Sequence, residues 1–151
     1  MRKIVLLMSI AALLVSASLV AGEADIEADK AAIEEVIGTA YIKGIHTEWD
    51  AEAVRKGFHP TFVMLIYDER GIRELPIGDW IKSIERNKEN HPEGPQYEIT
   101  YDIPMVDVTG NAAVAKIELY KDGGHVFTDY MSLYKFDDGW KIVGKIFYRY
   151  E

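Results

Sequence analysis

Apolar residues in the N-terminal half of the chain recur with the period of a helix. Positions i, i+3, i+4, i+7 and i+8 are occupied by Ile33, Val36, Ile37, Ala40 and Tyr41. A helix gathers such positions on one face, so this spacing predicts a helix over about residues 25–45. Asp50 is a typical N-cap residue and predicts a second, short helix that ends near Gly57. Pro76 predicts the start of a third helix with one apolar face formed by Ile77, Trp80, Ile81 and Ile84.

Most of the remaining chain alternates between apolar and polar residues, which is typical of β-strands. Strands are predicted at 62–67, 72–75, 97–108, 112–120, 126–136 and 140–150, the first of them as a buried strand. Pro104 cannot donate a ladder hydrogen bond, so it predicts an edge strand or a bulge. The Asp138-Gly139 pair predicts a two-residue hairpin turn between the last two strands, because both residue types tolerate positive φ.

This order of elements predicts the fold class. Two helices, two strands and a third helix precede four strands that follow one another as a meander. Separate helical and strand regions indicate an α+β fold rather than alternating βαβ units. We therefore expect a cone-like fold in which three N-terminal helices pack on a strongly curved, mostly antiparallel sheet. No repeat or linker interrupts the chain, which predicts a single domain over residues 22–151.

The first 21 residues read as a cleaved secretory signal peptide. A basic start, Met1-Arg2-Lys3, is followed by an apolar stretch over 4–15 and by small residues up to Ala21. The alternative is a transmembrane anchor, which usually needs about 20 apolar residues. The serines that interrupt the stretch favour the signal peptide: Ser9, Ser16 and Ser18. We expect an exported protein, periplasmic or secreted, without a membrane association after cleavage.

The composition narrows the possible partners. The chain has no cysteine, so neither a disulfide nor a lipid-modified cysteine is available. It carries 17 basic and 25 acidic residues, a net charge of −8, and loss of Arg2 and Lys3 would bring this to −10. An acidic surface argues against non-specific binding to nucleic acid or to anionic membranes.

Several stretches resemble the nuclear transport factor 2-like superfamily. They are Tyr41-Ile-Lys-Gly44, Trp49-Asp50 and Phe58-His-Pro-Thr-Phe62 near the start, and Asp129 to Lys135 and Gly139 to Lys145 in the last hairpin. The last two resemble the lumazine-binding and polyketide cyclase-like branch, and the likeness extends over residues 25–151. The resemblance implies a cone-shaped fold with a cavity between the helices and the sheet. It implies no single activity, because this superfamily includes isomerases, dehydratases, cyclases and non-enzymatic binders.

One enzyme class of this superfamily, the ketosteroid isomerases, uses a carboxylate base with an oxyanion hole made of a tyrosine and a neutral aspartic acid. Tyr41 matches the position of that tyrosine. Ile66 and Ser132 occupy the positions of the two acids, so the resemblance does not carry over this chemistry. A packing role for Tyr41 under the sheet is the simpler interpretation.

The face of the last hairpin that lines a cavity depends on its register. A two-residue turn at Asp138-Gly139 would place Ser132, Tyr130 and Thr128 opposite Lys145, Phe147 and Arg149. Lys145 and Arg149 would then suit an anionic or polar ligand, unless they form a solvated face. A single bulge would exchange the faces and bring Asp129 inward instead.

From these features we expect a ligand site formed by Tyr41, Trp49, Phe58, Trp80, Tyr130, Lys145 and Phe147. No metal site or cofactor is expected, because the four histidines lie in four separate segments without ligand spacing. The leading hypothesis is a non-catalytic binder of a small anionic or polar, partly aromatic molecule. One alternative is an isomerase, dehydratase or cyclase-type enzyme that uses Tyr41 with Asp129 or Asp68. Another is a structural module without a ligand.

The outer face of the predicted sheet also carries apolar residues. They occupy both odd and even positions in the strands at 97–108, 112–120 and 126–136, which predicts a sheet that is covered on both faces. Helices can cover only one of these faces, so we expect a homodimer through the outer face of the sheet.

Overall fold

The structure is a computed structural model that describes residue 23 and residues 25–151. The predicted signal peptide over 1–21 lies outside these residues. Within the described part of the chain, none of the helices combines the length and the apolar character needed to cross a membrane.

Three helical segments form one layer of the fold, as the sequence predicts. The first is α-helical over 25–36 and continues as a π-helix, η1 (Ile37–Thr47). The others are α2 (Ala51–Gly57) and α3 (Ile77–Asn90). The Asp50 carboxylate caps α2 by accepting hydrogen bonds from the backbone N–H groups of Glu52 and Ala53, at 3.0 and 3.2 Å. The predicted cap is therefore confirmed.

The π-helix changes which side chains of the first helix share a face. Its backbone hydrogen bonds run from i to i+5, so residues five apart become neighbours. Tyr41 and His46 are such a pair, and their rings meet edge-to-face with centroids 4.7 Å apart. A pattern analysis with a period of 3.6 does not reveal this contact.

Six strands form one mixed sheet, in the order β2-β1-β6-β5-β4-β3. The strands are β1 (Phe58–Asp68), β2 (Gly71–Pro76), β3 (Ile99–Thr109), β4 (Ala112–Lys121), β5 (Gly124–Phe136) and β6 (Gly139–Arg149). Only β1 and β6 pair in parallel, so the sheet is mostly antiparallel, as expected. Pro104 lies in the edge strand β3, where the register shifts between Asp102 and Met105.

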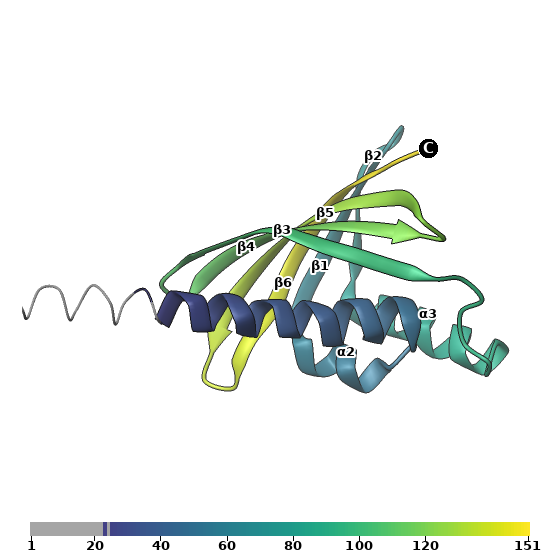
Figure 1. The fold of residues 1–151 in the computed structure, drawn as a ribbon. Helices are drawn as coiled ribbons and strands as arrows, with labels where there is room; N and C mark the ends of the chain where they lie inside the picture. Colours follow the sequence, from purple (N-terminus) through teal and green to yellow (C-terminus); the bar gives the residue numbers. More distant parts are fainter. Residues whose placement is uncertain (1–22, 24) are drawn as a thin grey trace, which may run out of the picture.

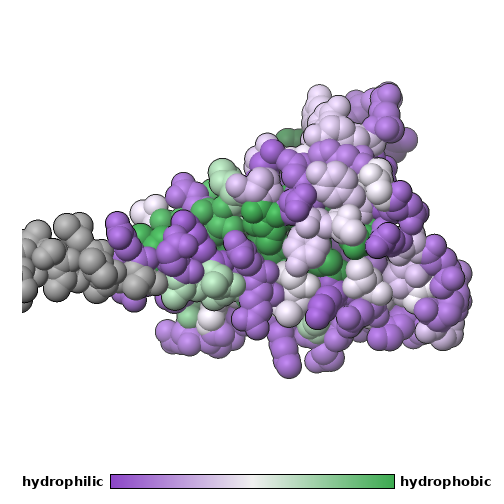
Figure 2. All heavy atoms as spheres, viewed as in Figure 1, coloured by the Kyte–Doolittle hydropathy of each residue, from purple (hydrophilic) through white to green (hydrophobic). Residues whose placement is uncertain are grey.

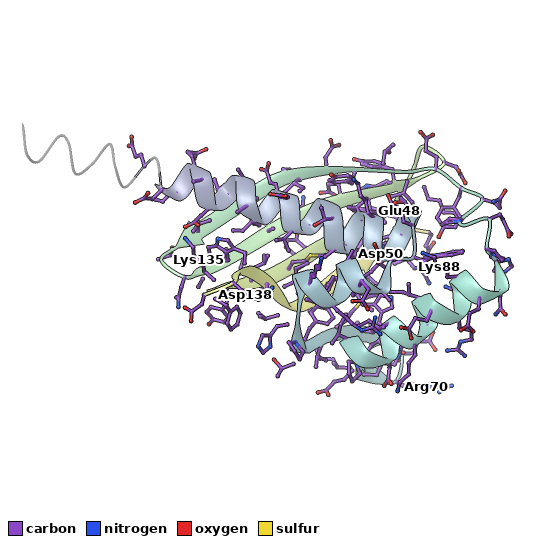
Figure 3. The ribbon with its side chains drawn as sticks, turned by 90° about the horizontal axis from the view of Figure 1, so that it is seen from below. Glu48, Asp50, Arg70, Lys88, Lys135 and Asp138 are labelled. Atoms are coloured by element: carbon purple, nitrogen blue, oxygen red, sulfur yellow. The ribbon has the colours of Figure 1, made fainter. Side chains whose placement is uncertain are left out.

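The helices cover one face of the curved sheet and leave the other face open (Figure 1). The view from below shows the first helix, α2 and α3 across this face, with Asp50 at the start of α2 (Figure 3). Between these layers lies the core, which includes Ile33, Ile37, Phe62, Ile117, Leu133 and Ile142. Hydrophilic residues surround an apolar band along the middle of the face seen in Figure 2.

Two glycines allow α2 to lie close to the first helix. A Cβ atom on Gly57 would be 2.2 Å from Cβ of Ala40, and one on Gly44 would be 2.8 Å from Cγ2 of Val54. Real Cβ atoms do not approach other carbons this closely, so larger residues would force the helices apart. The glycines therefore set the spacing of the helical layer.

The first strand differs from its predicted burial. Phe62 and Met64 are buried under the helices, but Leu65 is 38% and Tyr67 is 83% exposed. The prediction of a buried strand over 62–67 is wrong, since β1 buries only its helix-facing side. Its outer side belongs to the open face of the sheet.

The last hairpin also differs from its predicted register. The turn residues are Asp137 and Asp138, and Phe136 pairs with Gly139, whose φ is 111°. Between the pairs Leu133–Ile142 and Ser132–Gly144, β6 contains one extra residue, Val143. This bulge exchanges the side-chain faces of β6, so Met131 and Lys145 become partners in the helix-facing layer.

Candidate functional site

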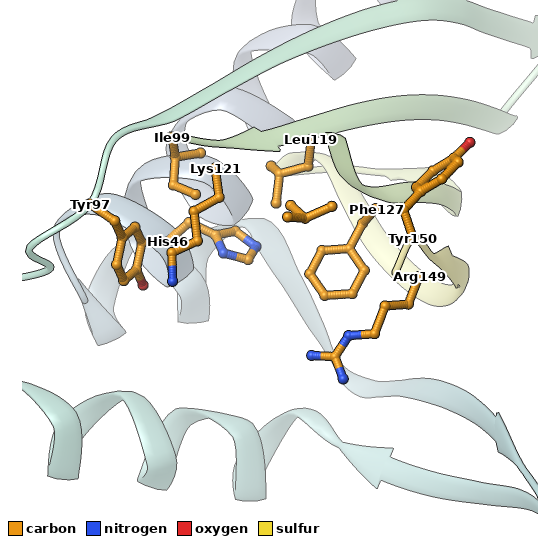
Figure 4. Close-up of a pocket in the computed structure, with 9 residues that line it drawn as sticks. His46, Tyr97, Ile99, Leu119, Lys121, Phe127, Arg149 and Tyr150 are labelled. Atoms are coloured by element: carbon orange, nitrogen blue, oxygen red, sulfur yellow. The ribbon is translucent and has the colours of Figure 1, made fainter. Parts of the chain in front are cut away.

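A cavity of about 360 Å³ opens at the end of the fold where the first helix and β3 approach β4, β5 and β6. It is lined by His46, Tyr97, Ile99, Leu119, Lys121, Val126, Phe127, Arg149 and Tyr150. Tyr97 and Lys121 approach it from one side, and Phe127 and Arg149 from the other, with His46 between them (Figure 4). The lining is mainly apolar and aromatic, with a few polar groups, which is typical of ligand sites.

The charged groups of this cavity are cationic. The Lys121 ammonium lies 4.1 Å from the ring centroid of Tyr97, and the Arg149 guanidinium lies 5.3 Å from that of Phe127. No carboxylate lines the cavity, and no ion pair involves either cation within the part of the chain that the structure describes. A protein with a net charge of −8 thus presents two unneutralised positive charges to one cavity.

His46 adds an unpaired polar atom to the cavity wall. Its Nε2 is buried and has no hydrogen-bond partner among the described residues. Burial, and then the nearby charge of Lys145, lower the pKa of His46 from 6.5 to about 3. The imidazole is therefore neutral at physiological pH and can donate one hydrogen bond and accept another.

A second polar group lies behind the cavity wall and consists of Tyr41, Asp129 and Lys145. The Tyr41 hydroxyl donates a 2.5 Å hydrogen bond to Oδ2 of Asp129. Nζ of Lys145 donates a 2.7 Å hydrogen bond to the same hydroxyl oxygen and lies 2.5 Å from Oδ1 of Asp129. Tyr41 and Asp129 are 0% exposed and Lys145 is 6% exposed. We refer to these three residues as the buried triad.

Aromatic rings surround the lysine of the buried triad. Nζ of Lys145 lies 4.6 Å from the ring centroid of Tyr41 and 5.2, 5.7 and 5.9 Å from those of Phe147, Trp80 and Phe127. Ring faces attract a cation, and the rings also exclude water from the amine. Lys145 therefore has one carboxylate, one hydroxyl and several ring faces as its environment.

Burial governs the protonation of the triad. Desolvation lowers the pKa of Lys145, and the charge and hydrogen bonding of Asp129 partly offset this effect. Desolvation also raises the pKa of Tyr41 well above its usual range, and the negative charge of Asp129 raises it further. The Tyr41 hydroxyl thus keeps its proton, and the lysine loses its proton more readily than an exposed lysine.

The structure brings together only some of the residues expected from the sequence. Tyr41 and Lys145 belong to the buried triad, and Trp80 and Phe147 contact its lysine. Phe58 packs in the core, with its ring centroid 4.9 Å from that of Phe62. None of these five residues lines the open part of the cavity.

The remaining two expected residues lie elsewhere. Trp49 is buried at the turn between η1 and α2, and its ring centroid is 6.4 Å from that of His91. Tyr130 is 46% exposed on the outer face of the sheet, where the bulge at Val143 pairs it with Ile146, itself 54% exposed. The structure therefore does not place Tyr130 on the helix-facing side.

Sequence reasoning did not identify His46, Lys121 or Phe127 as site residues. His46 lies five residues after Tyr41, a spacing that does not share a face in an α-helix, and Lys121 lies just beyond the strand predicted over 112–120. Asp129 is expected at the site only under two alternatives, a bulge that turns it inward and an enzyme that uses it with Tyr41, and the structure shows it hydrogen-bonded to Tyr41. Among the described residues no cluster of three or more His, Cys, Asp or Glu side chains could hold a metal ion.

Comparisons with known proteins agree with this architecture. The model of the protein family described as "Putative lumazine-binding" matches residues 28–148. The curated protein Aldolase FrzH of Cladobotryum sp is 25% identical over 119 residues, which are 78% of this chain and 90% of that protein.

Two solved structures of NTF2-like proteins of unknown function share the fold. The protein from Shewanella baltica OS155 has a TM-score of 0.63 and 24% identity, over 81% of this chain and 94% of the other. The protein from Silicibacter pomeroyi DSS-3 has a TM-score of 0.64 and 19% identity, over 85% and 98%. The fold, the cavity and the family match lead to one assignment: the chain belongs to the lumazine-binding family of the nuclear transport factor 2-like superfamily.

Proposed function

We propose that this protein binds a small, anionic, partly aromatic molecule in the cavity beside His46. The observation that carries the proposal is the pair of cations, Lys121 and Arg149, which face one cavity where none of the described lining residues is a carboxylate. Both side chains are exposed and hydrated, so an anionic ligand would meet two positive charges with no competing carboxylate among the residues that line this cavity. The volume of about 360 Å³ suits a molecule with one aromatic ring and one or two anionic groups.

The other lining residues support the same class of ligand. The rings of Tyr97 and Phe127 offer surfaces for an aromatic group, and each already holds one of the two cations in position. The neutral His46 offers a hydrogen bond to a polar substituent that is not charged. Lys145, which the sequence suggested for anion binding, is instead neutralised by Asp129.

Calorimetry with paired ligands tests this proposal. We would titrate the protein with benzoate, phenylacetate and benzoylformate, and with the corresponding uncharged amides. Arg149→Met and Lys121→Met should each weaken carboxylate binding by about tenfold or more, since a charged hydrogen bond contributes about 1.5–3 kcal/mol. Arg86→Met and Lys88→Met remove exposed charges outside the cavity and serve as matched controls. Equal affinity for acids and amides would contradict the proposal.

A second function, an enzyme that acts on carbonyl compounds, is favoured by the contact between Tyr41 and Asp129. A buried carboxylate within 2.5 Å of a tyrosine hydroxyl can move a proton to or from a bound substrate. The similarity to an aldolase supports this candidate. Proton NMR in D₂O would detect exchange of the α-protons of pyruvate, and Asp129→Asn should abolish that exchange. The same exchange rate in the variant would exclude a role for this carboxylate.

We also propose a homodimer through the open face of the sheet. Its outer surface carries exposed apolar side chains from four neighbouring strands, including Leu65, Val114, Tyr130 and Ile146. A patch of this kind on a small protein usually marks an association surface.

Export of the protein, based on residues 1–21, is proposed independently of the fold. The remaining alternative, a structural module without a ligand, predicts no affinity for any of the ligands above.

A further inference from the structure

We propose that Lys145 is a carbonyl-binding lysine, which forms an imine with a small 2-oxo acid held in the cavity. The inference rests on the proposed function only in that it uses the same cavity and the same cations. Its basis is the position of the amine: a hydroxyl and a carboxylate contact it, aromatic rings enclose it, and residues of the cavity wall separate it from the ligand space.

Two side chains that line the cavity also approach the buried triad. Phe127 lines the cavity, and its ring centroid lies 5.9 Å from Nζ of Lys145. His46 also lines the cavity, and its ring contacts that of Tyr41 at 4.7 Å. Rotation of one ring would therefore give a small carbonyl compound access to the amine. Side-chain rotations of this kind are fast compared with typical enzyme turnover.

Arg149 and the amine of Lys145 both lie near the ring of Phe127. Its guanidinium lies 5.3 Å from the centroid of the Phe127 ring, and Nζ of Lys145 lies 5.9 Å from the same centroid. A carboxylate bound by Arg149 would be on the cavity side of that ring. In a 2-oxo acid the carbonyl carbon is bonded directly to the carboxylate carbon, so an acid held by Arg149 would present its carbonyl group to the ring that also borders the amine.

The buried triad contains the groups that imine formation requires. Asp129 accepts a proton from the Lys145 ammonium, and the neutral amine attacks the carbonyl carbon to form the C–N bond. The carbonyl oxygen takes the proton of the Tyr41 hydroxyl, which regains a proton from the new nitrogen. Asp129 then protonates the carbinolamine hydroxyl, the C–O bond breaks and water leaves. The ammonium and the ketone have become a protonated imine and one water, with the positive charge conserved and Asp129 ionised beside it.

Stability alone does not explain a buried ion pair of this kind. The cost of removing two charges from water usually offsets their attraction, and apolar residues of similar size often serve as well or better. A desolvated lysine beside an acid is, in contrast, a common way to activate an amine as a nucleophile. The triad also neighbours the cavity rather than the opposite end of the core.

Reductive trapping of the unmodified sequence tests this inference. We would incubate the purified protein with pyruvate or benzoylformate and sodium cyanoborohydride at neutral pH, and then follow the labelling of each lysine by peptide mass spectrometry. A lysine that is only structural and 6% exposed should be labelled last. We expect Lys145 to be labelled first, ahead of exposed lysines such as Lys88. Lys145 remaining unlabelled while exposed lysines react would overturn the inference.

Two variants separate this inference from the proposed function. Tyr41→Phe keeps the ring and should slow the labelling of Lys145 by about 100-fold, as expected for loss of a proton donor; an unchanged rate would overturn the role of the hydroxyl. Arg149→Met should slow labelling by 2-oxo acids only. If benzoylformate binds but Lys145 is not labelled, imine formation by Lys145 is refuted and the proposed ligand binding stands. If Lys145 is labelled equally fast in Arg149→Met, the anion site fails and the imine stands.

Discussion

Tyr41 and Asp129 are 88 positions apart in the chain, yet they share a 2.5 Å hydrogen bond in the buried core. The bond joins η1 to β5, and Lys145 on β6 contacts both partners. The polar centre of this fold therefore depends on three elements that meet only in the folded state.

Asp129→Asn should destabilise the protein by about 3–5 kcal/mol, because it leaves the Lys145 ammonium buried without a counter-charge. The double variant Asp129→Leu/Lys145→Met should be more stable than Asp129→Asn, since it removes both charges. Urea denaturation at pH 7 measures both effects. Asp79→Asn disrupts the exposed pair with Lys82 and should cost only about 1 kcal/mol or less. If Asp129→Asn were as stable as Asp79→Asn, the buried ion pair seen in the structure would be contradicted.

Protonation of His46 should couple stability to pH. Its pKa is lowered from 6.5 to about 3 in the folded state, so the unfolded state binds more protons between these values. The free energy of unfolding that depends on neutral His46 is thus fully present above pH 6.5 and is lost as the pH falls toward 3. The loss amounts to about 3–5 kcal/mol over this range.

Urea denaturation of wild type and His46→Phe at pH 7.5 and pH 4.5 would isolate this effect. Several carboxylates also lose favourable contacts on acidification, among them Asp29 and Glu118, and they do so in both proteins. The difference between the two proteins therefore reports on His46 alone. Wild type should lose more stability than His46→Phe on acidification. Parallel pH profiles would show that this imidazole is not buried as described.

Gly57→Ala should destabilise the contact between α2 and the first helix. The added methyl group would lie 2.2 Å from Cβ of Ala40, which forces the helices apart and costs about 1–3 kcal/mol. Gly78→Ala is the matched control, because a Cβ there meets no atom within 4 Å and alanine favours the helix. Thermal unfolding should show a lower midpoint for the first variant and an equal or higher one for the second. A reversed order would contradict the close packing.

Ile146→Asp should dissociate the proposed homodimer. Ile146 is 54% exposed on the outer face of the sheet, where a buried carboxylate would face apolar residues of the partner. Light scattering after gel filtration should give the dimer mass for wild type and the monomer mass for the variant. Ile26→Asp changes an equally apolar exposed residue on the first helix and should leave the dimer intact. A monomeric wild type at micromolar concentration would exclude this assembly.

Export should remove the first residues of the chain. Mass spectrometry of protein recovered outside the cytoplasm should show cleavage near Ala21, where small residues follow the apolar stretch. Replacing Leu6 and Leu7 by Asp should block export, because it interrupts that stretch. A full-length product in the membrane fraction would instead support the anchor.

The class of the fold and most of its elements can be predicted from the residue pattern. The helical spacing around Ile37 and the alternation along β4 to β6 were sufficient, because period and turn residues are local properties of the chain. The Asp50 cap and the unusual position of Pro104 could be predicted for the same reason. The matching stretches near Tyr41 and in the last hairpin indicated the superfamily.

Which side chains meet at the site depends on contacts between distant segments of the folded chain. One extra residue at Val143 changed the register of the last hairpin, and a shift of one residue moves every side chain to the opposite face. This shift brought Asp129 and Lys145 together and left Tyr130 outside. The π-helical turn of η1 likewise placed His46 against Tyr41, although a regular α-helix would separate them. Bulges and π-helices arise from the packing of distant segments, so the residue pattern of a single segment does not reveal them.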